Sequence, residues 1–183
     1  MEIVKSFQNQ KILKYFLIAI LGSILLTISA KIKIPFYPVP MTMQTFAVLF
    51  IGMAFGWKIG VFTVFLYLIE GIVGLPVFAG TPEKGLGLSY IIGPTFGYLI
   101  GFLVAVFLAG YLKFETNLFK TFVKLVLCVS TIYILGLLWL GILIGWDKPV
   151  FKLGASPFLL AELFKILLLT FLSKKIIYLK KFI

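Results

Sequence analysis

The sequence predicts an all-α integral membrane protein, a bundle of six transmembrane helices with both termini in the cytoplasm. Of its 183 residues, 62% are hydrophobic and only 13% are charged, whereas soluble domains carry about a quarter charged residues. Apolar runs of about 17–25 residues, long enough to cross a bilayer, recur along the chain. The lysines gather in alternate hinges and in the two tails, a distribution that orients membrane proteins.

Six apolar segments follow one another, and no gap between them is long enough for a soluble domain. Residues 1–183 are therefore expected to form a single transmembrane domain. Several segments are short for a bilayer, so tilted, kinked or partly inserted helices are expected. The first span lacks an evident cleavage site, which favours an anchor over a removed signal peptide. The predicted spans are approximately 13–30, 41–55, 58–73, 94–112, 121–145 and 158–177.

The lysines predict the orientation of these spans. With six spans both termini lie on one side, and that side carries eleven lysines against five on the other. Because positive residues concentrate on the cytoplasmic side, we expect a multi-pass protein of the cell membrane with cytoplasmic termini. This orientation also accounts for the net charge of +11, so nucleic acid is not an expected partner. The eleven are Lys5, Lys11, Lys14, Lys58, Lys113, Lys120, Lys124, Lys174, Lys175, Lys180 and Lys181.

The composition argues against most enzyme chemistry. The chain has no histidine, which excludes His-based zinc sites and a His base for serine or cysteine catalysis. Its only aspartate is Asp147 and its only cysteine is Cys128, so an aspartyl dyad and an intrachain disulfide are both excluded. It also lacks G-x-x-x-x-G-K-[ST], the loop that binds nucleotide phosphates. We therefore expect neither an enzyme nor a bound cofactor or metal.

The polar residues of the spans gather in the predicted outer half of the membrane. In "LLAELFKILLL" (159–169), Glu162 and Lys165 share one helix face, roughly 7 and 12 Å below the outer end of span 6. Glu70 ends span 3 on the same side, and Thr42 and Gln44 open span 2 there. Ionisable groups inside a membrane usually mark functional sites. The pattern predicts a pocket that opens outward.

A structural role for these charges is the alternative. Glu162 and Lys165 could simply neutralise each other in a buried position. A converging Glu70 would leave an unbalanced carboxylate and so favour a binding role, although Glu70 could also be exposed at the interface.

The connection 74–93 is rich in glycine and contains prolines, a composition tolerated at membrane depth only where protein buries it or it lines a cavity. A lid over the pocket and a flexible external loop are the two readings. The side chains of Leu75, Val77, Phe78 and Tyr90 favour a loop that folds back onto the helices. The lid prediction rests on Gly74, Pro76, Gly80, Gly93 and Pro94.

Small residues recur at four-residue steps in two spans. Gly97, Gly101, Ala105 and Ala109 line one face of span 4, where they would let helix backbones approach closely. Ala19 and Ser23 make a similar step in span 1 with Gly22 between them, and they could dock either another span of this chain or a separate membrane partner.

Four segments together resemble the BioY family, the biotin-binding components of energy-coupling-factor vitamin transporters. They are "PVPMTMQTFAVLFIG", "YLIEGIVGLPVFAG", "GPTFGYLIGF" and "PFLLAELFK", and the likeness covers roughly residues 35 to 170. The resemblance implies a six-helix bundle that captures biotin from outside. It also implies docking onto a transmembrane coupling protein driven by two cytoplasmic ATPases, so that ATP is used by the partners and not by this chain.

Two positions depart from the family pattern. The family usually has aspartate three residues before the lysine, where this chain has Glu162, so the carboxylate extends one methylene further. The coupling face of such components is usually an alanine pair four residues apart in the first span. Here Ala19 and Ser23 match that pair only as small residues.

Biotin suits the polar residues that the resemblance selects. A carboxylate such as Glu162 accepts from the ureido N–H groups, and an ammonium such as Lys165 donates to the ureido oxygen. Because burying the valerate charge is more costly than burying the neutral ureido group, we expect the head deep and the acid at the mouth. In the opposite pose Lys165 holds the acid. The predicted contacts are Glu162, Lys165, Glu70, Gln44 and Thr42, with Tyr67, Phe78 and Tyr90 covering the bicycle.

Three other functions fit parts of the pattern. A component for another vitamin, such as riboflavin or thiamine, would have the same six spans. An intramembrane acyl or lipid transferase could use Glu162 or Glu70 as a base, but the sequence shows no nucleophile beside either residue. A purely structural subunit would not need the outward polar cluster.

Overall fold

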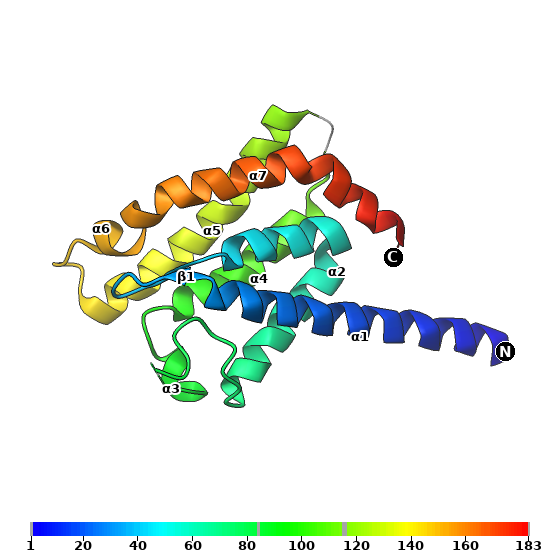
Figure 1. The fold of residues 1–183 in the computed structure, drawn as a ribbon, viewed down its shortest axis with the longest axis horizontal. Helices are drawn as coiled ribbons and strands as arrows, with labels where there is room; N and C mark the ends of the chain where they lie inside the picture. The colour runs from blue at the N-terminus through cyan, green and yellow to red at the C-terminus, as the bar shows by residue number, and fades with distance from the viewer. Residues whose placement is uncertain (1, 84, 115–116, 183) are drawn as a thin grey trace.

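The computed structural model describes residues 2–83, 85–114 and 117–182, with side chains described within residues 12–180. The backbone forms a bundle of long helices, shown in Figure 1. Lys84, one of the external lysines, lies outside the described residues, as do the side chains of Lys5, Lys11 and Lys181. The long elements are α1 (Glu2–Lys31), α2 (Gln44–Ile72), α4 (Phe96–Tyr111), α5 (Leu118–Ile144) and α7 (Leu159–Tyr178).

Length and hydropathy mark these helices as membrane-crossing. Four segments of the described chain are long and apolar enough to span a bilayer: Ile12–Lys31, Gln44–Ile72, Leu118–Ile144 and Val150–Tyr178. The shorter α4 is also apolar. Large apolar side chains such as Leu21, Ile142 and Phe171 are more than 60% exposed, as expected where a helix faces lipid.

The element α2 is two helices joined at Gly56. This glycine has φ 79° and ψ 171°, outside the helical region, and divides α2 into residues 44–55 and 57–72. A Cβ on Gly60 would lie 3.5 Å from the Cα of Gly52, although eight residues of straight helix would span about 12 Å. The chain therefore turns sharply at Gly56. With α2 counted as two helices, the predicted six-helix all-α bundle is confirmed.

The small residues of α4 are packing positions, as predicted. A Cβ on Gly97 would lie 2.4 Å from the carbonyl oxygen of Leu135 on α5, and one on Gly101 would lie 2.6 Å from the Cα of Ile132. Ala105 and Ala109 are fully buried. Helix α4 therefore packs tightly between α5 and α2, and the distances between these helices are short.

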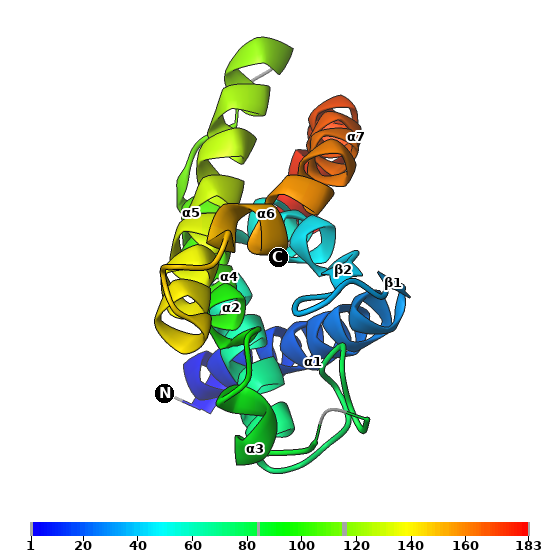
Figure 2. The same ribbon diagram turned by 90° about the vertical axis from the view of Figure 1, so that its left-hand side faces the viewer.

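The short elements gather at the end of the bundle opposite the start of α1 and the end of η2 (Leu179–Phe182) (Figures 1 and 2). Strands β1 (Lys33–Ile34) and β2 (Met41–Thr42) form a small antiparallel hairpin between α1 and α2. The 74–93 connection contains α3 (Leu88–Ile91), and α6 (Val150–Gly154) with η1 (Ser156–Phe158) leads into α7. These short elements were not predicted.

We predict that Gly97→Ala destabilises the bundle, because the added methyl group would overlap Leu135 and Trp139 on α5. Overpacking of this kind costs about 1–3 kcal/mol. Thermal unfolding in detergent should show a lower midpoint than for the parent protein. Val104→Ala, at a position of α4 that is 37% exposed, is the matched control. Equal midpoints for the two variants would contradict the packing described here.

Candidate functional site

Two charged side chains and one hydroxyl form a buried cluster between α2 and α7. Glu162 and Lys165, only 4% and 7% exposed, lie three residues apart on α7 and share one helix face. Lys165 Nζ is 2.6 Å from Glu162 Oε1. Thr45, in the first turn of α2, donates its hydroxyl to the same oxygen at 2.9 Å. The pairing makes burial of both charges tolerable.

All three protons of the Lys165 ammonium are used within the protein. Besides Glu162 Oε1, Nζ donates to the backbone carbonyl of Thr42 at 2.6 Å and to the Thr45 hydroxyl oxygen at 3.0 Å. An ammonium has three donors and no acceptor. In this structure Lys165 therefore has no proton left for a ligand, which differs from the donor role that the sequence suggested.

The second carboxylate oxygen of Glu162 is free. Oε2 is buried and has no hydrogen-bond partner among the described residues. The Tyr133 hydroxyl faces the carboxylate closely enough for a hydrogen-bond interaction with it, but it does not reach Oε2 with the geometry of a hydrogen bond. A buried, ionised oxygen without a donor is unfavourable, so this atom is the place where a ligand N–H would contribute most.

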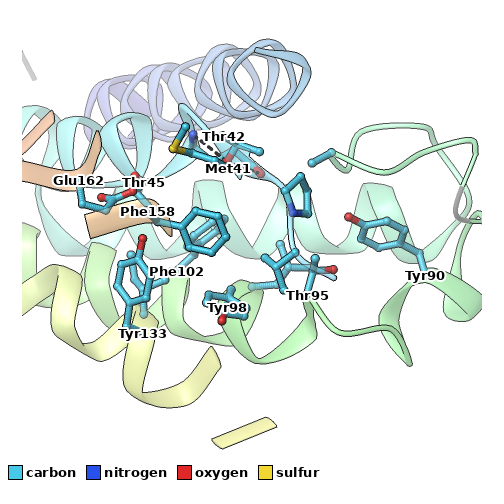
Figure 3. A pocket seen from close by; sticks show the side chains of 16 residues that line it. Met41, Thr42, Thr45, Tyr90, Thr95, Tyr98, Phe102, Tyr133, Phe158 and Glu162 are labelled. Atoms are coloured by element: carbon cyan, nitrogen blue, oxygen red, sulfur yellow. Dashed lines mark hydrogen bonds between the residues drawn. The ribbon is translucent and has the colours of Figure 1, made fainter. Parts of the chain in front are cut away.

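Glu162 lines a cavity at the end of the bundle that holds the short elements. The cavity has about 50 Å³ of room for water-sized groups. Figure 3 shows Glu162, Thr45, Phe158 and Tyr133 at one end of it and Thr95 and Tyr90 toward the other. The lining residues are Val39, Pro40, Met41, Thr42, Gln44, Thr45, Ala79, Tyr90, Thr95, Tyr98, Leu99, Phe102, Ile132, Tyr133, Phe158 and Glu162.

Three aromatic rings support one wall of this cavity. The Phe78 ring stacks on Tyr90 with centroids 4.9 Å apart and meets Tyr67 edge-on at 5.4 Å. Gln44 Nε2 donates to the Tyr67 hydroxyl at 2.8 Å, and that hydroxyl donates to the Val77 carbonyl at 3.1 Å. Tyr90 and Gln44 line the cavity directly, whereas Tyr67 and Phe78 lie behind it.

The 74–93 connection folds back onto the helices. Val77, Phe78 and Tyr90 are buried, whereas Leu75 is 51% exposed. Among the residues behind the lid prediction, Gly74 has φ 106°, a conformation that favours glycine. Gly80 is buried and donates its backbone N–H to the Tyr90 hydroxyl at 3.2 Å.

The remaining lid positions lie at the two ends of this connection. Gly93 accepts from Trp139 Nε1 at 2.9 Å, which ties the second end to α5. Pro94 follows it and is half-buried, and Pro76 is exposed near the first end. None of Gly74, Pro76, Gly80, Gly93 and Pro94 lines the cavity itself; Ala79 and Tyr90 are the residues of the connection that do.

Lys31, the last residue of α1, and Lys33, on β1, hold this connection in place. Lys31 Nζ donates to the Phe78 carbonyl at 2.9 Å, to the Thr81 carbonyl at 3.0 Å and to the Thr81 hydroxyl at 3.2 Å. Lys33 Nζ donates to the Ala79 carbonyl at 2.7 Å. Backbone carbonyls without regular secondary structure thus obtain charged donors, and the loop is held against the bundle.

Comparison with known proteins identifies the family. The model of the BioY family matches residues 4–181. The chain belongs to the BioY family.

The curated relatives carry the same description. The probable biotin transporter BioY of Pyrococcus horikoshii is 36% identical over 141 residues, 77% of this chain and 82% of the relative. Biotin transporter BioY2 of Lactococcus lactis is 32% identical, with 89% of each chain covered. The BioY of Thermotoga maritima is 33% identical over 83% of this chain and 89% of its own.

A solved structure has the same fold. The crystal structure of the S-component for biotin from an ECF-type ABC transporter superposes with a TM-score of 0.75 at 25% identity, covering 91% of this chain and 92% of that one. The chain is thus a multi-pass membrane transporter component of the BioY family and not an enzyme.

Within this BioY chain, Lys165 is not among the residues that line the cavity, and Glu70, Ala19 and Ser23 lie away from it. Glu70 accepts a hydrogen bond from the Ser23 hydroxyl on α1 and does not line the cavity, so it does not converge on Glu162. Ser23 and Ala19 are 1% and 0% exposed. A Cβ on Gly22 between them would lie 2.5 Å from Thr63 Cγ2 on α2. The small-residue step of α1 therefore packs against α2 of the same chain.

Sequence reasoning missed several residues of this BioY cavity. Thr45 and Tyr98 stand inside the quoted segments "PVPMTMQTFAVLFIG" and "GPTFGYLIGF", where their polar groups were available as a signal. Tyr98 donates to the Gly154 carbonyl at 2.8 Å and so connects α4 to α6. Tyr133 is one of the few polar side chains of α5, whereas Phe158 gave no signal beyond its hydrophobicity.

We predict that Lys31→Met loosens the segment 77–81 of this BioY chain, because the carbonyls of Phe78 and Thr81 lose a charged donor. An unmade buried hydrogen bond costs about 1–3 kcal/mol, so amide exchange in the segment should rise by about tenfold or more. Hydrogen-exchange mass spectrometry would measure it. Lys58→Met, which removes a charge over the Trp57 ring, is the control. Unchanged exchange in the Lys31 variant would contradict the fastening role.

Proposed function

We propose that this chain is the biotin-binding component of an energy-coupling-factor transporter. The observation that carries the proposal is the buried carboxylate of Glu162, a residue that lines the cavity: one oxygen is held by Lys165 and Thr45, and the other has no hydrogen bond from the described residues. The chain belongs to the BioY family, and its relatives are described as biotin transporters, which supports biotin as the ligand.

The ligand head fits this carboxylate. Biotin has two ureido N–H donors, and an ionised oxygen accepts from such donors with about twice the strength of a neutral acceptor. We place the ureido ring beside Glu162 Oε2, with Phe102, Tyr98 and Phe158 around the apolar bicycle. The valerate acid then points toward Thr95 and Tyr90, at the other end of the cavity.

Binding requires the cavity to widen. Its present room of about 50 Å³ suits a few waters and not a bicyclic molecule. Two segments flank it: strand β2, which contributes Met41 and Thr42, and the connection that contributes Ala79 and Tyr90. We propose that these segments, Gly74–Pro94 among them, act as a lid that moves apart when biotin enters and closes over it.

Delivery of the ligand inward needs partners. The lysine distribution supports cytoplasmic termini, so the cavity would open to the outside of the cell membrane. We propose that a transmembrane coupling protein docks on the bundle and that two cytoplasmic ATPases supply the energy. Because Ala19 and Ser23 are buried here, a partner on α1 would meet exposed side chains such as Phe16, Leu17 and Leu21.

We expect Glu162→Gln to weaken biotin binding by about 10- to 100-fold, since a hydrogen bond to a charged group contributes about 1.5–3 kcal/mol. Glu162→Asp, which keeps the charge, should retain most of the affinity. Titration calorimetry on the detergent-solubilised chain would measure both. Asp147→Asn, at an exposed acid that does not line the cavity, is the control. Parent-like affinity in the Gln variant would refute this site.

The identity of the vitamin has its own test. We expect biotin, but neither riboflavin nor thiamine, to raise the thermal unfolding midpoint, because a ligand stabilises the state that it binds. Biotin should also copurify with the chain and be identified by mass spectrometry. Stabilisation by another vitamin in place of biotin would reject the proposed ligand while leaving the fold unaffected.

A further inference from the structure

The Thr45 hydroxyl links α2 to the buried charges of α7 in one direction only. Thr45 Oγ1 lies 3.0 Å from Lys165 Nζ and 2.9 Å from Glu162 Oε1. An ammonium can only donate, so the hydroxyl accepts from Lys165, and its single proton is free to point at Glu162. The result is a chain of hydrogen bonds in which Lys165 donates to Thr45 and Thr45 donates to the Glu162 carboxylate.

These hydrogen bonds reach only one of the two carboxylate oxygens of Glu162. Oε1 receives both Lys165 and Thr45, at 2.6 and 2.9 Å. Oε2 receives no hydrogen bond from the described residues although it is buried. A carboxylate can rotate about its terminal bond with little resistance. Two donors that arrive from different helices hold it in one orientation.

We propose that Thr45 is a positioning residue for ligand binding: it holds Glu162 Oε1 so that Oε2 faces the cavity as the acceptor for a ureido N–H. This inference rests on the proposed function and adds the residue that selects the ligand-facing oxygen. Thr45 acts through Glu162, and its hydroxyl has no proton left for the ligand. Lys165 also donates a hydrogen bond to Glu162 Oε1.

The test compares ligands as well as variants. Thr45→Val keeps the shape of the side chain and removes the hydroxyl, whereas Thr45→Ser keeps the hydroxyl. Each purified full-length chain is titrated with biotin and with its two mono-N-methyl ureido analogues, which lack one donor each. Thr170→Val is the matched control, because the Thr170 hydroxyl is buried on α7 and, within the described part of the chain, bonds only to the Ile166 carbonyl of its own helix.

In the parent chain we expect one of the two methylations to weaken binding by about 10- to 100-fold. In Thr45→Val biotin itself should bind about 5- to 30-fold more weakly, and that methylation should then cost less than about threefold, because the carboxylate is no longer held for the N–H. Thr45→Ser and Thr170→Val should keep the parent pattern. If Thr45→Val does not fold, Thr45→Ala gives the same comparison.

Four results would overturn the inference. Equal weakening of biotin and both analogues by Thr45→Val would mean that Thr45 only supports packing. A Ser variant that behaves like the Val variant would mean that the hydroxyl is not the active feature. No methylation penalty in a parent chain that does bind biotin would remove the role of Oε2 but keep the proposed function. A parent chain that does not bind biotin rejects both.

Discussion

The ion pair between Lys165 and Glu162 is the constraint around which this end of the bundle is organised. Two charges taken out of water are stable only when partners replace the lost solvation. The pair obtains them from the start of α2: the Thr42 carbonyl and the Thr45 hydroxyl. Because these groups come from chain segments more than a hundred residues away from α7, the pair fixes the contact between the two helices.

The close packing deeper in the bundle supports that contact. The glycines of α4 allow its backbone to lie against α5, and Gly52 lies against the α4 residues Val106 and Ala109. The interior is therefore filled by side chains from α2, α4 and α5, among them Leu49, Phe102 and Ile132. A cavity remains near the short elements, where the chain is irregular. The cavity lies at that boundary.

The sequence alone predicted the class of fold, the six helices and the buried charges, because each leaves a local signal. A glutamate and a lysine in an apolar run are conspicuous, and glycines every four residues indicate a helix contact. Thr45 was not predicted as part of the cluster, because a threonine in a helix is ordinary until the helix that it faces is known. The prediction that Glu70 lies at the pocket beside Glu162 was wrong for the same reason. Its position along the span was foreseen, but the face that it occupies points to Ser23 on α1.

The reversal between the predicted spans 41–55 and 58–73 was expected, and the structure places it at Gly56, whereas the short elements escaped prediction. Lys31 on α1 and Lys33 on β1 were considered only as charges that orient the spans. Their hydrogen bonds to the carbonyls of residues 78–81 depend on how the loop returns to the bundle, which no local pattern encodes.

The attachment of Lys31 has a mechanical meaning. The Lys31 ammonium, at the end of a long and largely lipid-facing helix, donates hydrogen bonds to backbone carbonyls on either side of Gly80. A helix moves as a rigid unit along its whole length. A shift or tilt of α1 would therefore either move residues 78–81 with it or break their hydrogen bonds to Lys31. A displacement of the N-terminal half of the first helix would thus reach residues 78–81, beside the cavity, some 20 residues away along the same helix.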